Sequence, residues 1–136
     1  EELDEPYAFA MLDIDHFKKI NDTYGHDGGD KILKSLAKIL TDNTKGRDVV
    51  ARFGGEEFCV VLKKIEREEA IKFFVNLRAK VAENEVIIKD KTIKVTVSIG
   101  ISFGKGHCEI DDMLEACDSA LYVAKENGRN RVEIAL

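Results

Sequence analysis

The sequence predicts an α+β domain in which a mainly antiparallel sheet has helices packed on its face. Short apolar runs of strand character alternate with longer segments whose apolar residues recur every three or four positions. A two-glycine step, Gly54-Gly55, joins two of the apolar runs, as is typical of a β-hairpin. The chain has 136 residues, of which 44% are hydrophobic, so we expect one domain over residues 1–136 with a single core.

The first half of the chain is predicted to form a strand, two helices and a hairpin. Residues 7–13 form a short buried strand, and residues 15–24 form a helical turn or short helix that ends at Gly25. A longer helix covers 30–40, and the hairpin covers 49–62. The apolar stripe of the longer helix consists of Ile32, Leu33, Leu36, Ala37 and Leu40.

The second half is predicted to contain helices that alternate with strands. A helix over 66–82 precedes one strand over 91–103, in which apolar residues alternate with small or polar ones. A last helix ends near Gly128, and 131–135 form a closing edge strand. The order β-α-α-β-β-α-β-α-β predicts a split β-α-β, ferredoxin-like sheet with helices on one face and the other face open for a ligand.

Charge and composition exclude several functions. A net charge of −5 argues against a general nucleic-acid binder, which needs a basic face. No apolar run approaches the ~20 residues of a membrane helix, and no signal peptide opens the chain, so this domain is predicted to make no membrane contact. The spacing of Cys59, Cys108 and Cys117 fits neither a zinc site nor a disulfide framework, which favours a cytoplasmic location.

Carboxylates gather at the ends of the predicted strands. Asp13 and Asp15 follow the first apolar run, and Glu56 and Glu57 come directly after the glycine step. Hard divalent cations bind such oxygen ligands, and glycine allows positive φ and a close approach of a ligand to the backbone. An acidic turn alone is more often simply solvated, but its combination with Asp13 favours a metal site.

Four runs of residues also carry a family resemblance. They are Asp-Ile-Asp-His-Phe-Lys-Lys-Ile-Asn-Asp-Thr-Tyr-Gly-His at 13–26, Gly-Gly-Glu-Glu-Phe at 54–58, Val-Ser-Ile-Gly-Ile at 97–101, and Ala-Leu-Tyr-Val-Ala-Lys-Glu-Asn-Gly-Arg-Asn at 120–130. In this order they resemble the GGDEF family of bacterial diguanylate cyclases. The resemblance implies a palm-like fold that condenses two GTP molecules into cyclic di-GMP and two pyrophosphates. It further implies dependence on Mg²⁺ or Mn²⁺ and activity as a homodimer.

The resemblance also assigns the catalytic residues. It implies that Asp13, Glu56 and the carbonyl of Ile14 bind metal, and that Glu57 is a second-metal ligand or helps to deprotonate the attacking 3′-hydroxyl. Two metal ions close together can activate a hydroxyl nucleophile and stabilise the leaving phosphate.

Substrate contacts follow from the same motifs. Asn21 and Asp30 match the guanine-reading pair, although each could equally be a helix cap or a helix-start carboxylate. The backbone N–H groups of Phe17 and Lys18, with the Lys18 charge, would face the phosphates. We expect Gly54 and Gly55 to let the nucleotide pass close to the backbone.

Two cations of the last motif complete the predicted substrate contacts. The resemblance places Lys125 and Arg129 on the β- and γ-phosphates, and their i, i+4 spacing predicts that they project together from the last helix. Alternatively, they complement the dipole at the C-terminus of that helix.

Two features depart from the family pattern. Where many members have an Arg-x-x-Asp product-inhibition motif, this chain has Lys45 and Asp48, and lysine cannot reproduce the bidentate fork of arginine. Arg47 could compensate only through a changed loop path. The usual N-terminal helix is also missing, so we expect an N-terminally truncated domain. The parent protein would carry an upstream sensory or dimerisation module and could be membrane-anchored.

Other functions compete with this interpretation. The chain could be a catalytically silent module that binds GTP or cyclic di-GMP, although the intact motifs argue against loss of activity. It could also be a polymerase-like or adenylyl cyclase-like palm enzyme, which the negative charge and the Asn21–Asp30 pair disfavour.

Overall fold

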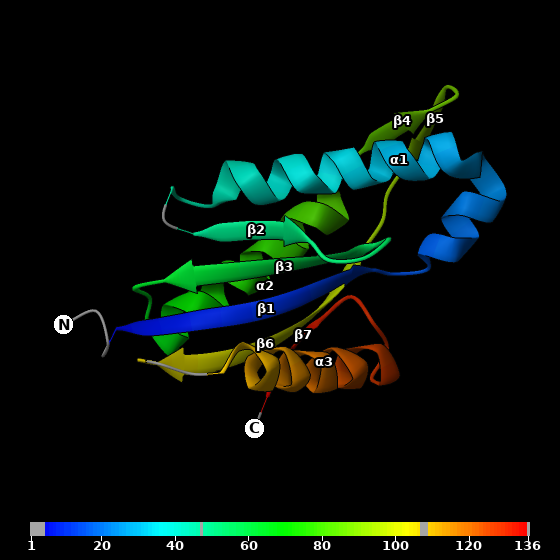
Figure 1. Cartoon of the computed structure of the whole chain (residues 1–136). Coiled ribbons are helices and arrows are strands. Elements are labelled where there is room, and N and C mark those ends of the chain that lie inside the picture. Colours follow the sequence, from blue (N-terminus) through cyan, green and yellow to red (C-terminus); the bar gives the residue numbers. More distant parts are fainter. Residues whose placement is uncertain (1–4, 47, 107–108, 136) are drawn as a thin grey trace.

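A computed structural model of the chain describes residues 5–46, 48–106 and 109–135 (Figure 1). Arg47 and Cys108, which enter the sequence argument, lie outside the described residues. The elements are β1 (Pro6–Ile14), α1 (Phe17–Asn43), β2 (Val49–Arg52), β3 (Glu57–Lys63), α2 (Arg67–Glu83), β4 (Val86–Ile88), β5 (Lys91–Ile93), β6 (Val97–Lys105), α3 (Ile110–Glu126) and β7 (Val132–Ile134).

The central sheet has the strand order β2-β3-β1-β6-β7. All neighbouring strands are antiparallel except β6 and β7, which run parallel. The strand β1 lies in the middle, so its C-terminal end meets the start of β3 on one side and the start of β6 on the other. This architecture confirms the predicted α+β, palm-like fold.

Helices cover both faces of the sheet. Leu12 and the other inward residues of β1 share one core with residues of α1 and α2, whereas Met11 packs with Cys117 and Leu121 of α3 on the opposite face. Figure 1 shows α2 behind the sheet and α3 in front of it. The prediction that one face stays open is therefore wrong where α3 crosses β6 and β1.

Gly100 explains how α3 comes so close to the sheet. A Cβ atom at Gly100 would lie 2.4 Å from the carbonyl oxygen of Cys117 and 2.4 Å from the backbone nitrogen of Leu121. The small residues on this side of β6 were expected to leave room for a ligand. At Gly100, that room holds the backbone of α3 instead.

The predicted strand over 91–103 is two strands in the structure. Its first residues form β5, which pairs with β4 in a separate two-stranded sheet, and only β6 joins the central sheet. Lys89 and Asp90 connect β4 to β5 with φ values of 49° and 69°. Hairpin turns of this kind usually contain Asn or Gly, so Lys-Asp gave no turn signal and β4 was missed.

The remaining elements match their predictions closely. The helix α1 contains a break at Gly25, where φ is 77° and ψ is 172°, so its first turns form the predicted short helix before the long one. The ends of α2 and α3 and the edge strand β7 lie within a few residues of the predicted bounds. None of the helices in the described parts of the chain has the length and apolar character that a membrane crossing requires.

Candidate functional site

The sheet brings the two acidic motifs together at one end of β1. Asp13 lies opposite Glu57 in the antiparallel register of β1 and β3. The backbone N–H of Ile14 donates a 3.4 Å hydrogen bond to the carbonyl of Glu56. Carboxylates from two segments more than forty positions apart therefore meet because β1 and β3 are direct neighbours.

Asp13 is buried, but only half of its carboxylate is paired. Its residue exposure is 5%, and its Oδ2 accepts a hydrogen bond from the Lys125 ammonium at the end of α3. Its Oδ1 is buried and has no hydrogen-bond partner. Buried polar atoms without a partner are rare and costly, so this oxygen is a candidate ligand atom.

The two glutamates lie in the electrostatic field of Asp13. Burial, together with hydrogen bonding to and repulsion by Asp13, raises the pKa of Glu56 to about 7, and the Lys125 charge opposes this rise. Burial first and the Asp13 charge second raise the pKa of Glu57. Three acidic groups therefore share one small region with a single ammonium, which is unfavourable without a further cation.

The residues present fit a hard divalent cation. They offer carboxylate oxygens, one of them unpaired, and a backbone carbonyl at Ile14, and Mg²⁺ commonly uses only one or two carboxylates from the protein. Among the described residues, no group of three or more acidic, histidine or cysteine side chains is arranged so that it could hold a metal ion by itself. The Lys125 ammonium, which pairs with Asp13, supplies positive charge at this position in the structure.

The connection between β2 and β3 differs from the predicted glycine turn. Neither Gly54 nor Gly55 has positive φ, so the turn does not use the positive φ that glycine permits. The turn is held instead by Arg52, whose guanidinium donates to the carbonyls of Gly54 and Gly55 at 2.6–3.2 Å. A Cβ at Gly55 would have no atom within 4 Å, so the backbone there is open to a ligand.

The start of α1 provides a possible anion contact. The helix begins at Phe17, after His16 in a left-handed conformation, and neither a capping side chain nor an acidic residue occupies its first turn. Phe17 is buried, whereas Lys18 is exposed. Backbone N–H groups in the first turn of a helix lack intrahelical acceptors, so they can bind an anion such as phosphate.

The break in α1 brings the predicted guanine-binding residues close together. A Cβ atom at Gly29 would lie only 1.9 Å from Oδ1 of Asn21. Asn21 therefore rests against the backbone directly before Asp30, which is exposed. Because Gly25 breaks the helix between them, the two side chains can face one ligand.

Lys125 and Arg129 do not project from one helix face, so that part of the prediction is wrong. The helix α3 ends at Glu126, and Arg129 has a left-handed φ of 64° beyond it. Its backbone N–H still donates to the carbonyl of Ala124. Lys125 pairs with Asp13, whereas the Arg129 guanidinium lies 4.0 Å from Asp15.

Sequence reasoning missed the role of Asp15. This residue is 3% exposed, and its carboxylate accepts from Thr96 Oγ1 at 2.6 Å, Ser98 Oγ at 2.6 Å and the backbone N–H of Asn130 at 3.0 Å. The alternation around the start of β6 places Thr96 and Ser98 on one side, but it could have identified them as partners only if the register with β1 had been known.

The predicted product-inhibition residues lie at the far end of β3. The Asp48 carboxylate accepts from the backbone N–H groups of Lys45 and Lys63 at 3.0 Å and 3.1 Å, so it stabilises its own loop. A cavity of about 240 Å³ adjoins them. It is lined by Asn43, Lys45, Asp48, Leu62, Lys63, Lys64, Ile65, Glu69 and Phe73.

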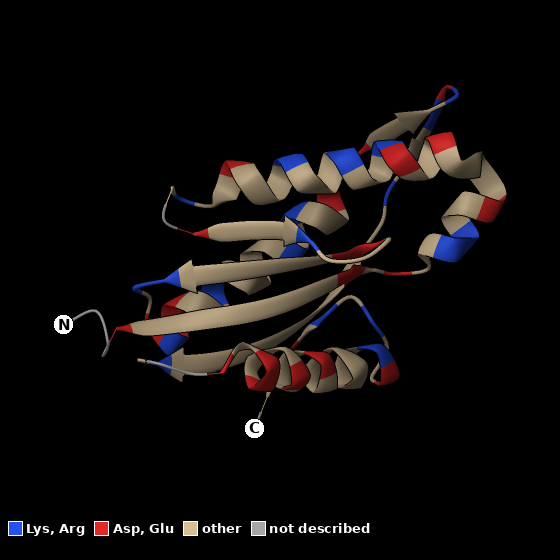
Figure 2. Cartoon of the chain, viewed as in Figure 1, with Lys and Arg blue, Asp and Glu red and all other residues tan. Residues whose placement is uncertain are grey.

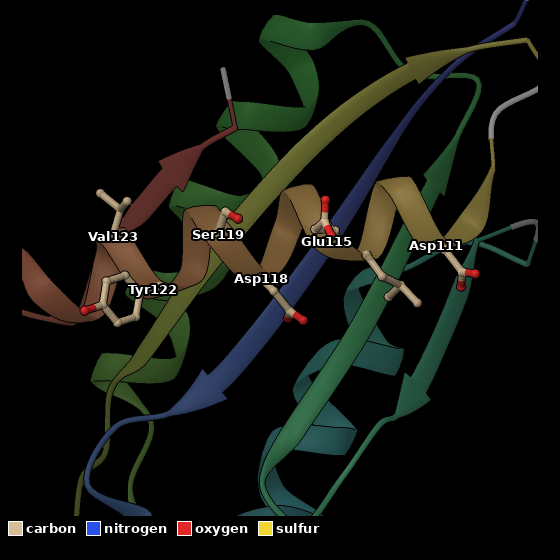
Figure 3. A pocket seen from close by; sticks show the side chains of 7 residues that line it. Asp111, Glu115, Asp118, Ser119, Tyr122 and Val123 are labelled. Carbon is tan, nitrogen blue, oxygen red and sulfur yellow. The ribbon is translucent and has the colours of Figure 1, made fainter.

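A second hollow runs along the outer side of α3 (Figure 3). It has a volume of about 700 Å³ and is lined by Asp111, Leu114, Glu115, Asp118, Ser119, Tyr122 and Val123. None of the predicted nucleotide or metal ligands lines it. Figure 2 shows that acidic residues recur along α3, whereas both acidic and basic residues lie along α1.

Comparisons with known proteins agree with this geometry. The sequence model described as "Diguanylate cyclase, GGDEF domain" matches residues 1–131. Diguanylate cyclase A of Treponema denticola is 42% identical over 132 residues, which cover 96% of this chain but only 36% of that relative.

Solved structures show the same architecture. The GGDEF domain of DgcB from Caulobacter crescentus, determined with c-di-GMP, has a TM-score of 0.90 at 32% identity, over 96% of this chain and 78% of that one. The active GGEEF domain of a diguanylate cyclase from Vibrio cholerae has a TM-score of 0.87 at 36% identity. The match covers 97% of this chain and 84% of that one.

Proposed function

The chain belongs to the GGDEF family of diguanylate cyclase domains, and from this membership we propose that it condenses two GTP molecules into cyclic di-GMP and two pyrophosphates. The observation that carries the proposal is the meeting of Asp13 with Glu56 and Glu57 around a buried carboxylate oxygen that has no partner. This arrangement needs a cation to be stable.

Asp13, Glu56 and the Ile14 carbonyl would hold Mg²⁺ or Mn²⁺. When bound, such an ion stabilises negative charge on the reacting phosphate and on the pyrophosphate that leaves. Lys125 would leave its ion pair with Asp13 and bind the phosphates, since its side chain is 29% exposed and can change conformation at the surface. The first-turn N–H groups of α1, at Phe17 and Lys18, would bind phosphate oxygens.

The reaction joins the 3′-oxygen of one GTP to the α-phosphorus of the other. The bond between the α- and β-phosphates breaks, pyrophosphate leaves, and the 3′-hydroxyl proton passes to a base. We assign this role to Glu57. Burial and the Asp13 charge raise its pKa, which makes its carboxylate a stronger base and supports the assignment. The second 3′-oxygen then attacks the remaining α-phosphorus in the same way, a second pyrophosphate leaves, and the ring closes.

One domain offers a single set of these residues, so two domains would have to meet face to face, each with one GTP. Catalysis therefore depends on a homodimer. We further propose that residues 1–136 are the catalytic part of a longer cytoplasmic protein whose upstream module senses a signal or drives dimerisation. The chain spans about a third of the length of its Treponema relative, which supports this view.

Guanine selection would rest on Asn21 and Asp30. An amide and a carboxylate can satisfy the N1–H, N2–H₂ and O6 groups of guanine, whereas adenine lacks this pattern. Asp30→Ala should weaken GTP binding by roughly 1–3 kcal/mol. Calorimetry with GTP and ATP provides the check, and equal affinities of the unmutated chain for both would refute the role.

The decisive experiment is product analysis. The chain, fused to a dimeric coiled coil, is incubated with GTP and Mg²⁺, and cyclic di-GMP is identified by mass spectrometry. Glu56→Gln keeps the shape of the side chain, so its fold should be intact while product formation is lost. If the unmutated fusion binds GTP by calorimetry yet forms no product, the chain is a silent nucleotide-binding module.

A further inference from the structure

Asp15 is a buried carboxylate for which the proposed reaction has no use. Both of its oxygens accept hydrogen bonds from within the protein. Oδ2 accepts from Thr96 Oγ1 and from the backbone N–H of Asn130, and Oδ1 accepts from Ser98 Oγ. With its side chain 1% exposed, Asp15 has no oxygen left for a metal ion or a nucleotide.

The turn that Asp15 binds has an unusual backbone. Arg129 and Asn130 have φ values of 64° and 47°, which are unfavourable for residues with a side chain. Two successive residues in this conformation persist only where their surroundings hold them. Asp15 supplies one such contact through the N–H of Asn130.

Other contacts fix the rest of this turn. The N–H of Arg129 donates to the Ala124 carbonyl, its own carbonyl accepts from Nε of Arg131 at 3.2 Å, and Oδ1 of Asn130 accepts from Arg78 of α2 at 2.6 Å. These bonds hold the backbone of Arg129 in place, while its side chain stays 38% exposed. At 4.0 Å from Asp15, the guanidinium keeps most of its donors free.

We infer that Asp15 is a positioning residue whose carboxylate holds the Arg129–Asn130 turn against the end of β1 and so aims the Arg129 guanidinium at the β- and γ-phosphates of the nucleotide. An arginine on a pre-ordered backbone loses less freedom on binding, so its contact with phosphate is stronger. This inference rests on the proposed function, in which Arg129 contacts the triphosphate.

The test compares ligands with and without the distal phosphates. Two ligands are titrated by calorimetry in the presence of Mg²⁺: GMP, and the α,β-methylene analogue of GTP. The proteins are the unmutated chain, Asp15→Asn, Arg129→Ala and the double variant. Asp112→Asn, an exposed carboxylate on α3, is the control for loss of one charge. Asp15→Asn and Arg129→Ala should each weaken binding of the analogue about tenfold, leave GMP binding unchanged, and show no additional loss in combination.

A second variant guards against loss of folding in Asp15→Asn. Thr96→Val preserves the shape of the side chain but removes one donor to Asp15, and we expect a loss of a few-fold for the analogue alone. In the free protein, the Asn130 amide should exchange slowly with solvent, and either variant should speed this exchange.

Equal losses for the analogue and GMP, additive losses in the double variant, or an unchanged Asn130 amide would each overturn the inference. If the losses follow the prediction but the unmutated chain, fused to the dimeric coiled coil, makes no cyclic di-GMP, the proposed function fails while Asp15 keeps its positioning role. If the unmutated chain binds neither nucleotide, both proposals fail.

Discussion

Asp13 and Asp15 lie two residues apart at the end of β1, and each faces a cation that follows or ends α3. Asp15 is surrounded by donors and is fully hydrogen-bonded. Asp13 has one partner, Lys125, and one buried oxygen without any. The difference teaches that one strand end can hold a carboxylate that stabilises the fold beside one whose bonding is incomplete without a ligand.

The neighbours of each carboxylate explain the difference. The hydroxyl of Thr96, directly before β6, the hydroxyl of Ser98 in β6 and the backbone N–H of Asn130 surround Asp15 and donate to both of its oxygens. Glu56 and Glu57 lie near Asp13 instead, and the Asp13 charge raises the pKa of both. Such crowding of like charges is found where a functional cation is bound, and the rest of the fold compensates for its cost.

The largest expected effect is on catalysis, from Asp13→Asn. Loss of this metal ligand should reduce the rate of cyclic di-GMP formation by about a thousandfold, since a bound metal supplies several kcal/mol of transition-state stabilisation. Without metal, the free energy of unfolding should change by no more than about 1 kcal/mol. The lost ion pair with the partly exposed Lys125 contributes little, and the loss is offset because Asp13 no longer repels Glu56 and Glu57. Product assays and denaturant titrations measure the two effects. Near-normal turnover would remove Asp13 from the metal site.

Unlike Asp13→Asn, the variant Asp15→Asn should clearly lower the stability of the fold. The variant weakens three hydrogen bonds and a buried charge contact, so we expect a loss of about 2–3 kcal/mol in the free energy of unfolding, or roughly 10 °C in Tm. Calorimetric melting in the presence of a chelator provides the measurement. A melting temperature within one degree of that of the unmutated chain would mean that Asp15 stabilises the fold no more than Asp13 does.

A smaller effect concerns pH and sharpens the comparison further. The folded metal-free protein binds a proton at Glu56 more tightly than the unfolded chain does, because the pKa rises from 4.5 to about 7. This contribution to stability is fully present below pH 4.5 and is lost as the pH rises through about 7.

Melting curves with a chelator should therefore show that Glu56→Gln gains Tm relative to the unmutated chain as the pH rises from 5 to 8. Added Mg²⁺ should raise the Tm of the unmutated chain most above pH 7, where Glu56 is ionised. An identical pH dependence of the two proteins would contradict the proposed crowding around Asp13.

The smallest effect extends the comparison to Asp48. Like those of Asp15, both carboxylate oxygens of Asp48 accept hydrogen bonds from within the protein, here from the backbone N–H groups of Lys45 and Lys63. The Asp48 carboxylate therefore holds the backbone of Lys45 beside Lys63. Lys45→Arg should restore inhibition by added cyclic di-GMP by several-fold, because arginine offers paired donors. Progress curves of the dimerised fusion decide this. Strong inhibition of the unmutated protein through this loop would show that lysine suffices.

The sequence predicted local features well and spatial partners poorly. The predicted break at Gly25 is confirmed, because glycine adopts its φ of 77° without the steric cost that a side chain would bring. The turn at Lys89 and Asp90 was missed, because its left-handed residues are not those that normally mark a hairpin. Gly100 was read as room for a ligand, although it provides room for α3.

The sequence by itself determined the α+β class, the family resemblance and the residues that gather in the candidate site, because these depend on local periodicity and on motif order. Only the tertiary structure decided how each carboxylate is used. Asp13 and Asp15 look equivalent along the chain. Their difference arises from Thr96 directly before β6, from Ser98 in β6, and from the turn at Arg129 and Asn130. Partners more than eighty positions away are fixed by strand register and helix packing, which no local pattern encodes.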